Sequence, residues 1–237
     1  MVIQRQHIFK EVKMKVINEK KEDRKMNNYM EQFIFTDRLN NELKVLKTYP
    51  EIMQITPVLC FHGYAGVGKT SFAKLLGEEL CADVMYFAMN ERSLKNSFIE
   101  KEIKPLFRTR SLLDPGDKCF SRGIILDEFH NLSPKDQDRF KVVFDELVDA
   151  LVIVCLNTMN TKPLHKCLTQ PIYSRVHPIN FNIRNEENEL TEMVGKVIEK
   201  YPLLSRTKVY SWLPDMRVIT REGKLSVLRS AGVGGAI

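Results

Sequence analysis

The sequence lacks any apolar run of the 18 or so residues that a membrane-spanning helix requires. Its first 24 residues carry scattered charges without an apolar segment, which argues against a secretory signal peptide. The five cysteines are odd in number and form no C-x-x-C pair, and Cys60 and Cys155 lie in apolar runs typical of buried, reduced thiols. Internal repeats are also absent. Together these absences predict a soluble intracellular protein.

The chain has 237 residues, of which 43% are hydrophobic and 28% charged, as in ordinary globular domains. The net charge of +6 is uneven, because residues 1–50 hold 11 Lys and Arg against 7 Asp and Glu, and residues 204–237 hold 6 against 2. A basic excess at both ends is compatible with binding to a polyanion such as nucleic acid. A solvated surface explains the same charges equally well.

From residue 57 onward, short apolar runs alternate with longer amphipathic ones, which predicts an α/β fold with a parallel sheet sandwiched by helices. The five expected strands are residues 58–62, 82–87, 123–127, 151–156 and 177–183. The expected helices are residues 37–48, 70–81, 134–150, 185–201 and a stretch from 214 onward. We therefore expect a charged N-terminal extension (1–35), a nucleotide-binding α/β domain (36–183) and a small helical lid (184–237).

Residues 63–70 read GYAGVGKT and match the phosphate-binding pattern G-x-x-x-x-G-K-[ST] between an expected strand and an expected helix. Glycines let backbone N–H groups surround the phosphates, and the helix N-terminus favours anions. Lys69 is expected to reach the β- and γ-phosphates, and the Thr70 hydroxyl to bind Mg²⁺. The predicted nucleotide-binding residues of the loop are Gly63, Tyr64, Ala65, Gly66, Val67, Gly68, Lys69, Thr70 and Ser71.

A second motif, ILDE at residues 125–128, is an apolar strand that ends in two carboxylates. In a parallel sheet this end of the strand faces the ligand crevice beside the phosphate loop. Asp127 is therefore expected to help hold Mg²⁺, and Glu128 to orient and activate the attacking water.

The motifs GYAGVGKT, ILDEFHNL, VIVCLN, YSRVHPINF and LPDMR occur in the order found in AAA+ ATPases, and the chain resembles clamp-loader subunits, such as replication factor C small subunits and their phage counterparts. The resemblance implies that Asn157 is a polar residue that helps to position the water, with Asn160 close by as an alternative. It implies that Arg175, in Ser-Arg-Val, acts on ATP held by a neighbouring subunit. It also implies that Arg217, in Pro-Asp-Met-Arg, contributes to the nucleotide site from the lid.

Three departures from the clamp-loader pattern stand out. The Lys-Tyr-Arg-Pro box near the N-terminus is missing, and Val176 replaces the usual Cys after Ser-Arg. The collar domain that assembles the loader ring does not follow the lid. A minimal or truncated form, or an oligomer built through the ATPase domains, would account for this.

The leading hypothesis is an ATP- and Mg²⁺-dependent ATPase subunit of a DNA replication machine, acting with other AAA+ subunits on primer–template DNA and a sliding clamp. Lys69, Glu128, Asn157 and Arg175 are its predicted catalytic residues, and Thr70 and Asp127 its predicted metal ligands. One alternative is a viral-type replicative helicase or helicase-loader ATPase. Another is a scaffold subunit that binds ATP without hydrolysing it.

Overall fold

The structure is a computed structural model that describes residues 32–49, 53, 55, 57–89, 99–108, 116–158, 162–183 and 187–230. Most of the expected N-terminal extension, and Asn160, lie outside the described residues. None of the described helices is long and apolar enough to cross a membrane.

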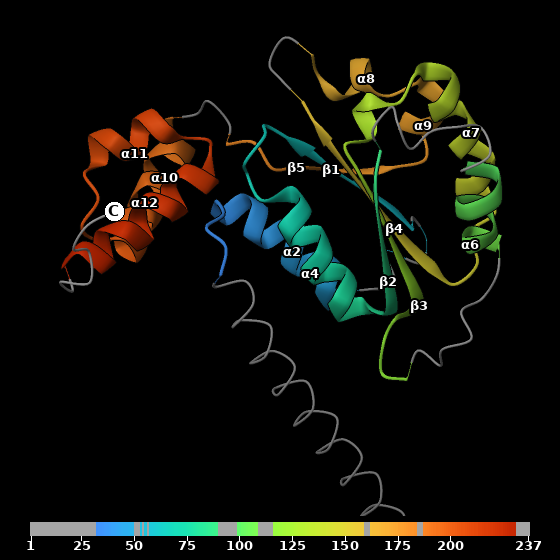
Figure 1. Ribbon diagram of the computed structural model, residues 1–237, viewed down its shortest axis with the longest axis horizontal. Coiled ribbons are helices and arrows are strands. Elements are labelled where there is room, and N and C mark those ends of the chain that lie inside the picture. The colour runs from blue at the N-terminus through green and yellow to red at the C-terminus, as the bar shows by residue number, and fades with distance from the viewer. Residues whose placement is uncertain are drawn as a thin grey trace, which may run out of the picture. The chain divides into compact units, whose positions relative to one another are not determined.

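Five parallel strands form one sheet in the order β2-β3-β4-β1-β5 (Figure 1). The strands are β1 (Val58–Gly63), β2 (Cys81–Ala88), β3 (Phe120–Asp127), β4 (Ala150–Asn157) and β5 (His177–Asn180). The predicted parallel α/β sheet is therefore confirmed. Because Gly63 pairs with Asn157 and Asp127 pairs with Ala88, the carboxyl ends of β1, β4, β3 and β2 all meet at one end of the sheet.

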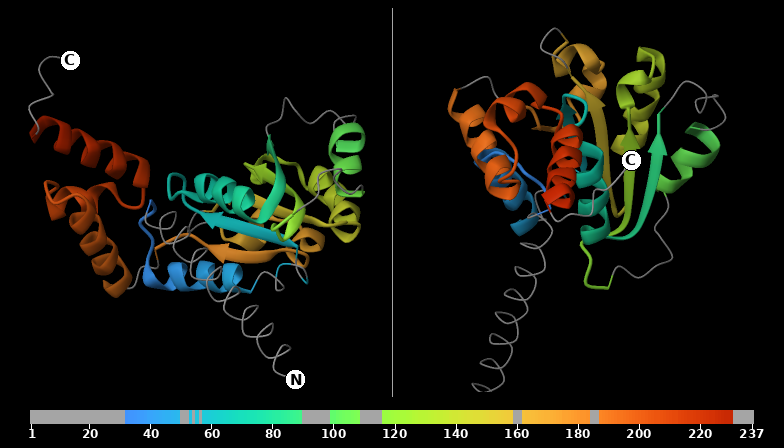
Figure 2. Two further views of the ribbon diagram at one scale, coloured as in Figure 1. Left: turned by 90° about the horizontal axis from the view of Figure 1, so that it is seen from below. Right: turned by 60° about the vertical axis from the view of Figure 1, so that its left-hand side comes forward.

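Helices precede, connect and follow the strands. The helices are α2 (Asp37–Thr48), α4 (Lys69–Leu80), α6 (Lys104–Arg108), α7 (Pro134–Asp145), α8 (Leu164–Cys167), α9 (Gln170–Tyr173), α10 (Glu187–Lys200), α11 (Arg206–Trp212) and α12 (Met216–Ser230), with a π-helical turn η1 (Ile99–Ile103) and a 3₁₀ turn η2 (Phe129–Asn131). Helix α4 lies on one side of the sheet, and α6 and α7 lie on the other (Figures 1 and 2).

Local sequence explains where the main helices begin. The Thr36 hydroxyl accepts a hydrogen bond from the N–H of Leu39 and caps α2, while Ser133 caps α7 through the N–H of Asp136. Pro134 follows as the first residue of α7, where its missing N–H costs nothing. Such caps can be read from the sequence.

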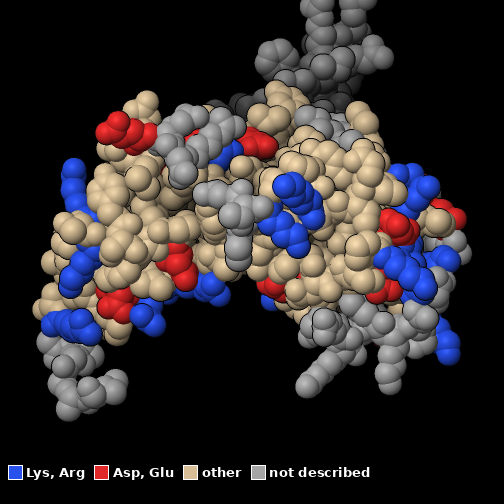
Figure 3. Space-filling model, turned by 90° about the horizontal axis from the view of Figure 1, so that it is seen from above, with Lys and Arg blue, Asp and Glu red and all other residues tan. Residues whose placement is uncertain are grey.

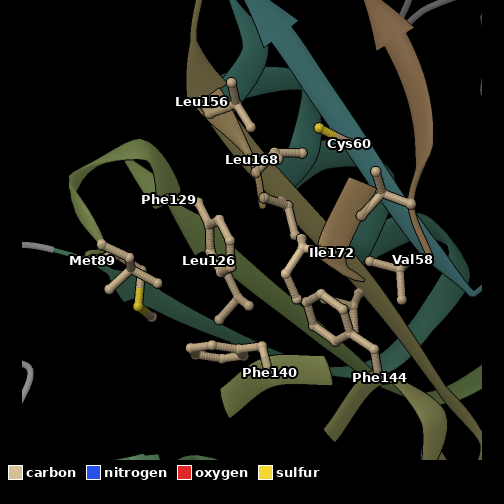
Figure 4. Packing of buried hydrophobic residues seen from close by; sticks show 14 of the residues in the cluster. Val58, Cys60, Met89, Leu126, Phe129, Phe140, Phe144, Leu156, Leu168 and Ile172 are labelled. Carbon is tan, nitrogen blue, oxygen red and sulfur yellow. The ribbon is translucent and has the colours of Figure 1, made fainter. Parts of the chain in front are cut away.

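A hydrophobic core cluster lies between the sheet and helices α7, α8 and α9 (Figure 4). Phe129, Phe140 and Phe144 point toward one another there, with ring centroids 5.3–6.5 Å apart. On the other side of the sheet, Phe61 of β1 packs against Phe72 of α4. Burial on both faces accounts for the continuous apolar strands, and it fixes the strand ends that carry polar residues.

Two predicted elements end several residues earlier than the sequence pattern indicated. Helix α7 ends at Asp145, not at residue 150, because residues 146–149 turn the chain back into β4, with Asp149 in the left-handed region at φ 47°. Strand β5 ends at Asn180, not at residue 183, because the Asn180 side chain accepts from the N–H of Asn182 and forms a turn.

An arginine of α2 holds the end of β5 in place. Arg38 donates from Nη2 to the carbonyl oxygens of Asn180 (3.2 Å) and Asn182 (3.0 Å). Its Nε donates to Oε1 of Glu189 in α10 (2.8 Å). A single side chain therefore connects α2, the end of β5 and the first of the helices that follow the sheet.

Candidate functional site

The phosphate-loop motif occupies residues 63–70 between β1 and α4, as the sequence predicts. Gly66 and Gly68 have φ values of 84° and 96°, in the left-handed region that favours glycine. Gly68 is the N-cap residue of α4, so the loop runs directly into the helix N-terminus. Ala65 and Ser71 are exposed, whereas Val67 is buried and anchors the loop.

The Lys69 side chain folds back along this loop. Its Nζ donates to the carbonyl oxygens of Gly63 (2.9 Å) and Tyr64 (2.6 Å) and to Oδ1 of Asn157 (3.0 Å). Burial lowers the pKa of Lys69 from 10.5 to about 8, against the opposing attraction of nearby acidic groups that include Glu128. The lysine charge is thus held in a partly desolvated place at the end of the sheet, where anions are attracted strongly.

Three donors converge on the carboxylate of Asp127. The Thr70 hydroxyl lies 3.1 and 3.0 Å from its two oxygens, and the N–H of Glu128 donates to Oδ1 at 2.9 Å. The Tyr86 hydroxyl donates to Oδ2 at 2.7 Å. Tyr86 is exposed on the outer strand β2, and both burial of its hydroxyl and this bond raise its pKa above the usual range.

Tyr86 was missed by sequence reasoning. A tyrosine within a strand is typical of core packing, and only the strand order, which places β2 beside β3, brings it to Asp127. No sequence motif pointed to this contact.

Glu128 follows Asp127 with a backbone in the left-handed region, at φ 56°. Its carboxylate accepts from Nδ2 of Asn157 (Oε2, 3.3 Å) and lies 3.2 Å from Nε2 of His130. The Asn157 side chain therefore contacts Lys69 through its oxygen and Glu128 through its nitrogen. Residues predicted from three separate motifs meet in one hydrogen-bonded set.

Two histidines near these motifs have hydrogen-bonded side chains. His130 lies between Glu128 and the backbone of Asn157, and burial lowers its pKa. His62 in β1 lies 3.5 Å from the Thr158 hydroxyl. Among the described residues, no three His, Cys, Asp or Glu side chains gather in a way that could hold a metal ion.

Arg217 lies beside the phosphate loop. Its N–H and Nε contact Oδ1 of Asp215, at 3.0 and 3.4 Å. Asp215 in turn packs on Gly66 so closely that a Cβ there would overlap its carboxylate, and Arg217 Nε is the next neighbour. The Pro-Asp-Met-Arg segment is thus in contact with the loop, while the Arg217 side chain is largely exposed.

Arg175 is the one predicted catalytic residue that the structure does not bring to the others. It precedes β5, whose first residue, His177, pairs with Leu59 near the start of β1, whereas the phosphate loop follows the end of β1. Its guanidinium forms a two-point ion pair with Asp145 of α7, with N–O distances of 2.7 and 2.9 Å.

Residues 59–176 match the sequence model of the ATPase family associated with various cellular activities (AAA). Among solved structures, the chain is similar to three variants of RuvB from Thermotoga maritima, with TM-scores of 0.50 and sequence identities of 14%, 15% and 14%. The matches cover 72% of this chain and 52%, 53% and 52% of the RuvB chains, so the chain spans about half the length of these structures. At such identities the likeness shows the fold alone. No curated protein matches the chain.

Proposed function

We propose that this chain, whose residues 59–176 form an AAA ATPase domain, is a Mg²⁺-dependent ATPase that works in an oligomer on DNA. The finer proposal is a clamp-loader-like subunit, acting in replication on primed DNA and a sliding clamp. One observation carries the catalytic part: the Asn157 side chain contacts both Lys69 and Glu128. The cation for the phosphates and the carboxylate for the attacking water therefore lie in one connected set.

ATP is proposed to bind along residues 63–71. Backbone N–H groups of the loop and the N-terminus of α4 would contact its phosphates, and Lys69 would exchange its carbonyl partners for phosphate oxygens. Arg217, which lies beside Gly66, would add a second cation from the lid.

Thr70 and Asp127 fit a magnesium site. The ion prefers hard oxygen ligands and commonly uses one or two protein groups together with water and phosphate oxygens. The Thr70 hydroxyl and the Asp127 carboxylate are such ligands, and they lie 3.0–3.1 Å apart. When bound, Mg²⁺ neutralises charge on the phosphates, while Tyr86 and the N–H of Glu128 hold Asp127 in position.

Glu128 is proposed to orient the attacking water and accept its proton, a role for which a carboxylate near the phosphate site is suited. Asn157 restrains Glu128 from one side. Arg175 lies away from this set, which supports the proposal that it acts on ATP held by a neighbouring subunit.

DNA binding is the part of the proposal that rests on charge. The basic excess at the two ends of the sequence favours contact with phosphates. On the face seen in Figure 3, however, Lys and Arg side chains are interspersed with Asp and Glu and form no single basic patch. We therefore expect DNA binding to be salt-sensitive and to need several subunits side by side.

Glu128→Gln tests the proposed function. The variant should bind ATP with unchanged affinity and lose turnover by about 100-fold or more, because only the water-activating group is removed. Glu78→Gln, on the exposed face of α4, is the matched control and should turn over ATP normally. Primer–template DNA should stimulate the wild-type protein at low salt, and the effect should fade as salt rises.

Three outcomes would contradict parts of this proposal. A wild-type protein that binds ATP without turnover would favour the scaffold alternative. Normal turnover in Glu128→Gln would remove the assigned role of Glu128. Turnover that is indifferent to DNA at all salt concentrations would remove the DNA-dependent part.

A further inference from the structure

His130 contacts the catalytic set at two points. It lies in η2, two residues after Glu128, and its ring is largely buried. Nδ1 of the ring is 3.2 Å from the backbone nitrogen of Asn157, and Nε2 is 3.2 Å from Oε2 of Glu128. The ring therefore lies between the end of β4 and the carboxylate proposed to activate water.

The first of these contacts determines where the ring carries its proton. A backbone N–H can only donate, so Nδ1 must accept and be unprotonated. The ring proton of neutral His130 is then on Nε2, the nitrogen that faces Glu128. The backbone N–H of Asn157 thus makes His130 a donor to Glu128.

The second contact complements the direct one from the Asn157 side chain. Nδ2 of Asn157 reaches the Glu128 carboxylate at 3.3 Å, and the Asn157 backbone reaches it through His130. The backbone at Glu128 is in turn fixed by Phe129, which is fully buried in the core. With the backbone fixed, the direction of the Glu128 carboxylate depends on these two side-chain donors.

We propose that His130 is a positioning residue, which holds the Glu128 carboxylate toward the end of β4 by donating to it from Nε2. The inference rests on the proposed ATPase function and adds a residue to which neither the motifs nor the family resemblance assigned a role. Its loss should lower kcat and leave ATP binding unchanged, because His130 contacts Glu128 and Asn157, and in the described part of the chain no hydrogen bond joins it to the phosphate loop.

Two variants separate the two contacts of the ring. In His130→Gln the side-chain amide nitrogen takes a place close to Nε2 and can still donate to Glu128. In His130→Asn the side-chain oxygen takes a place close to Nδ1 and can still accept from the backbone N–H of Asn157. No donor is then left at the place of Nε2, so the contact with Glu128 is lost. We expect kcat to fall by about 10- to 100-fold in His130→Asn, by analogy with the loss of residues that orient metal-ligating side chains. His130→Gln should retain most of the turnover, and both variants should keep the wild-type ATP dissociation constant and melting temperature.

Combining His130→Asn with Glu128→Gln provides a further check. If His130 acts through Glu128, the double variant should be no slower than Glu128→Gln alone. Wild-type kcat in His130→Asn would overturn the positioning role. Equal losses of ATP affinity or melting temperature in both His130 variants would also overturn it, because they would indicate a general structural role.

Nitrogen NMR of the His130 ring gives a measurement that needs no nucleotide. Nδ1 should show the shift of an unprotonated nitrogen at neutral pH. A protonated Nδ1 in a protein that hydrolyses ATP would overturn the positioning role and leave the proposed function intact. A wild-type protein without turnover would overturn both.

Discussion

Among single residues, His62 shows how burial changes a charge state. It lies in β1 with its Nδ1 3.5 Å from the Thr158 hydroxyl. Burial lowers its pKa from 6.5 to about 4, and the positive charges of Lys69 and Arg38 act in the same direction. Between these pH values the folded protein keeps His62 neutral while the unfolded chain protonates it.

This difference predicts a loss of stability in acid. As pH falls from 6.5 toward 4, the unfolded chain binds the extra proton, so the free energy of unfolding decreases, by about 3 kcal/mol at pH 4 from this group. The free energy of unfolding, measured with urea, should therefore change less between pH 7 and pH 4 in His62→Gln than in the wild type. His165→Gln, on the exposed side of α8, is the control and should keep the wild-type difference. Equal acid sensitivity of His62→Gln and the wild type would contradict the assignment.

Among the elements, α2 connects the sheet to α10. Besides the Arg38 contacts, the N–H of Asp37 donates to Oε1 of Glu192 at 2.6 Å, and Lys196 lies 2.7 Å from both Asp37 and Glu192. These contacts join the first turn of α2 to the middle of α10. The exposed ion pairs among them contribute little singly, so Arg38, which is largely buried, is expected to dominate.

Arg38→Ala should lower the free energy of unfolding by about 2–4 kcal/mol. The change removes the donor to the carbonyls of Asn180 and Asn182 and the ion pair with Glu189. Lys44→Ala, on the exposed side of the same helix, should change stability by less than about 0.5 kcal/mol. Chemical denaturation of both variants measures the difference, and equal small effects would show that Arg38 does not connect these elements.

Patterns within elements were predicted well, and contacts between elements were not. The bounds of α2 were predicted because a helical pattern is local to its own residues. The carboxyl ends of β1 and β3 were predicted to carry the site because the phosphate loop and Asp127 follow apolar runs. The positions of Tyr86 and His130 relative to Asp127 and Glu128 depend on strand order and on a turn beyond β3, which no periodicity reveals.

At the scale of the whole molecule, the proposed role of Arg175 on a neighbour's ATP predicts how subunits would cooperate. Arg175→Ala should lower turnover by about 10³-fold or more if the side chain completes a neighbour's site. Glu128→Gln should be inactive because it lacks the carboxylate proposed to activate the water in its own site. An equal mixture of the two inactive variants should restore about a quarter of the wild-type turnover. In randomly mixed head-to-tail assemblies, about a quarter of the interfaces join a subunit with an intact Glu128 to a neighbour with an intact Arg175.

Native mass spectrometry of Glu128→Gln with ATP and primer–template DNA counts the subunits in the same assembly. A complex of fewer than six subunits that needs primed DNA supports the clamp-loader proposal. A hexamer around the DNA favours the helicase alternative. If mixing restores no turnover although the variants assemble, Arg175 does not act between subunits.

The short strand β5 limits how copies of this chain can join. Phe181 donates its N–H to the carbonyl oxygen of His62 in β1. Because the direction of the backbone groups alternates along a strand, the N–H and C=O groups of the even-numbered residues in this segment point to the open edge of the sheet. On that side Pro178 has no N–H, and the carbonyls of Asn180 and Asn182 already accept from Arg38. The addition of another strand at this edge of the sheet is therefore disfavoured, and so is aggregation by edge-to-edge pairing of sheets. Copies of the chain could still associate through side chains and helices, without pairing of their sheets at the β5 edge.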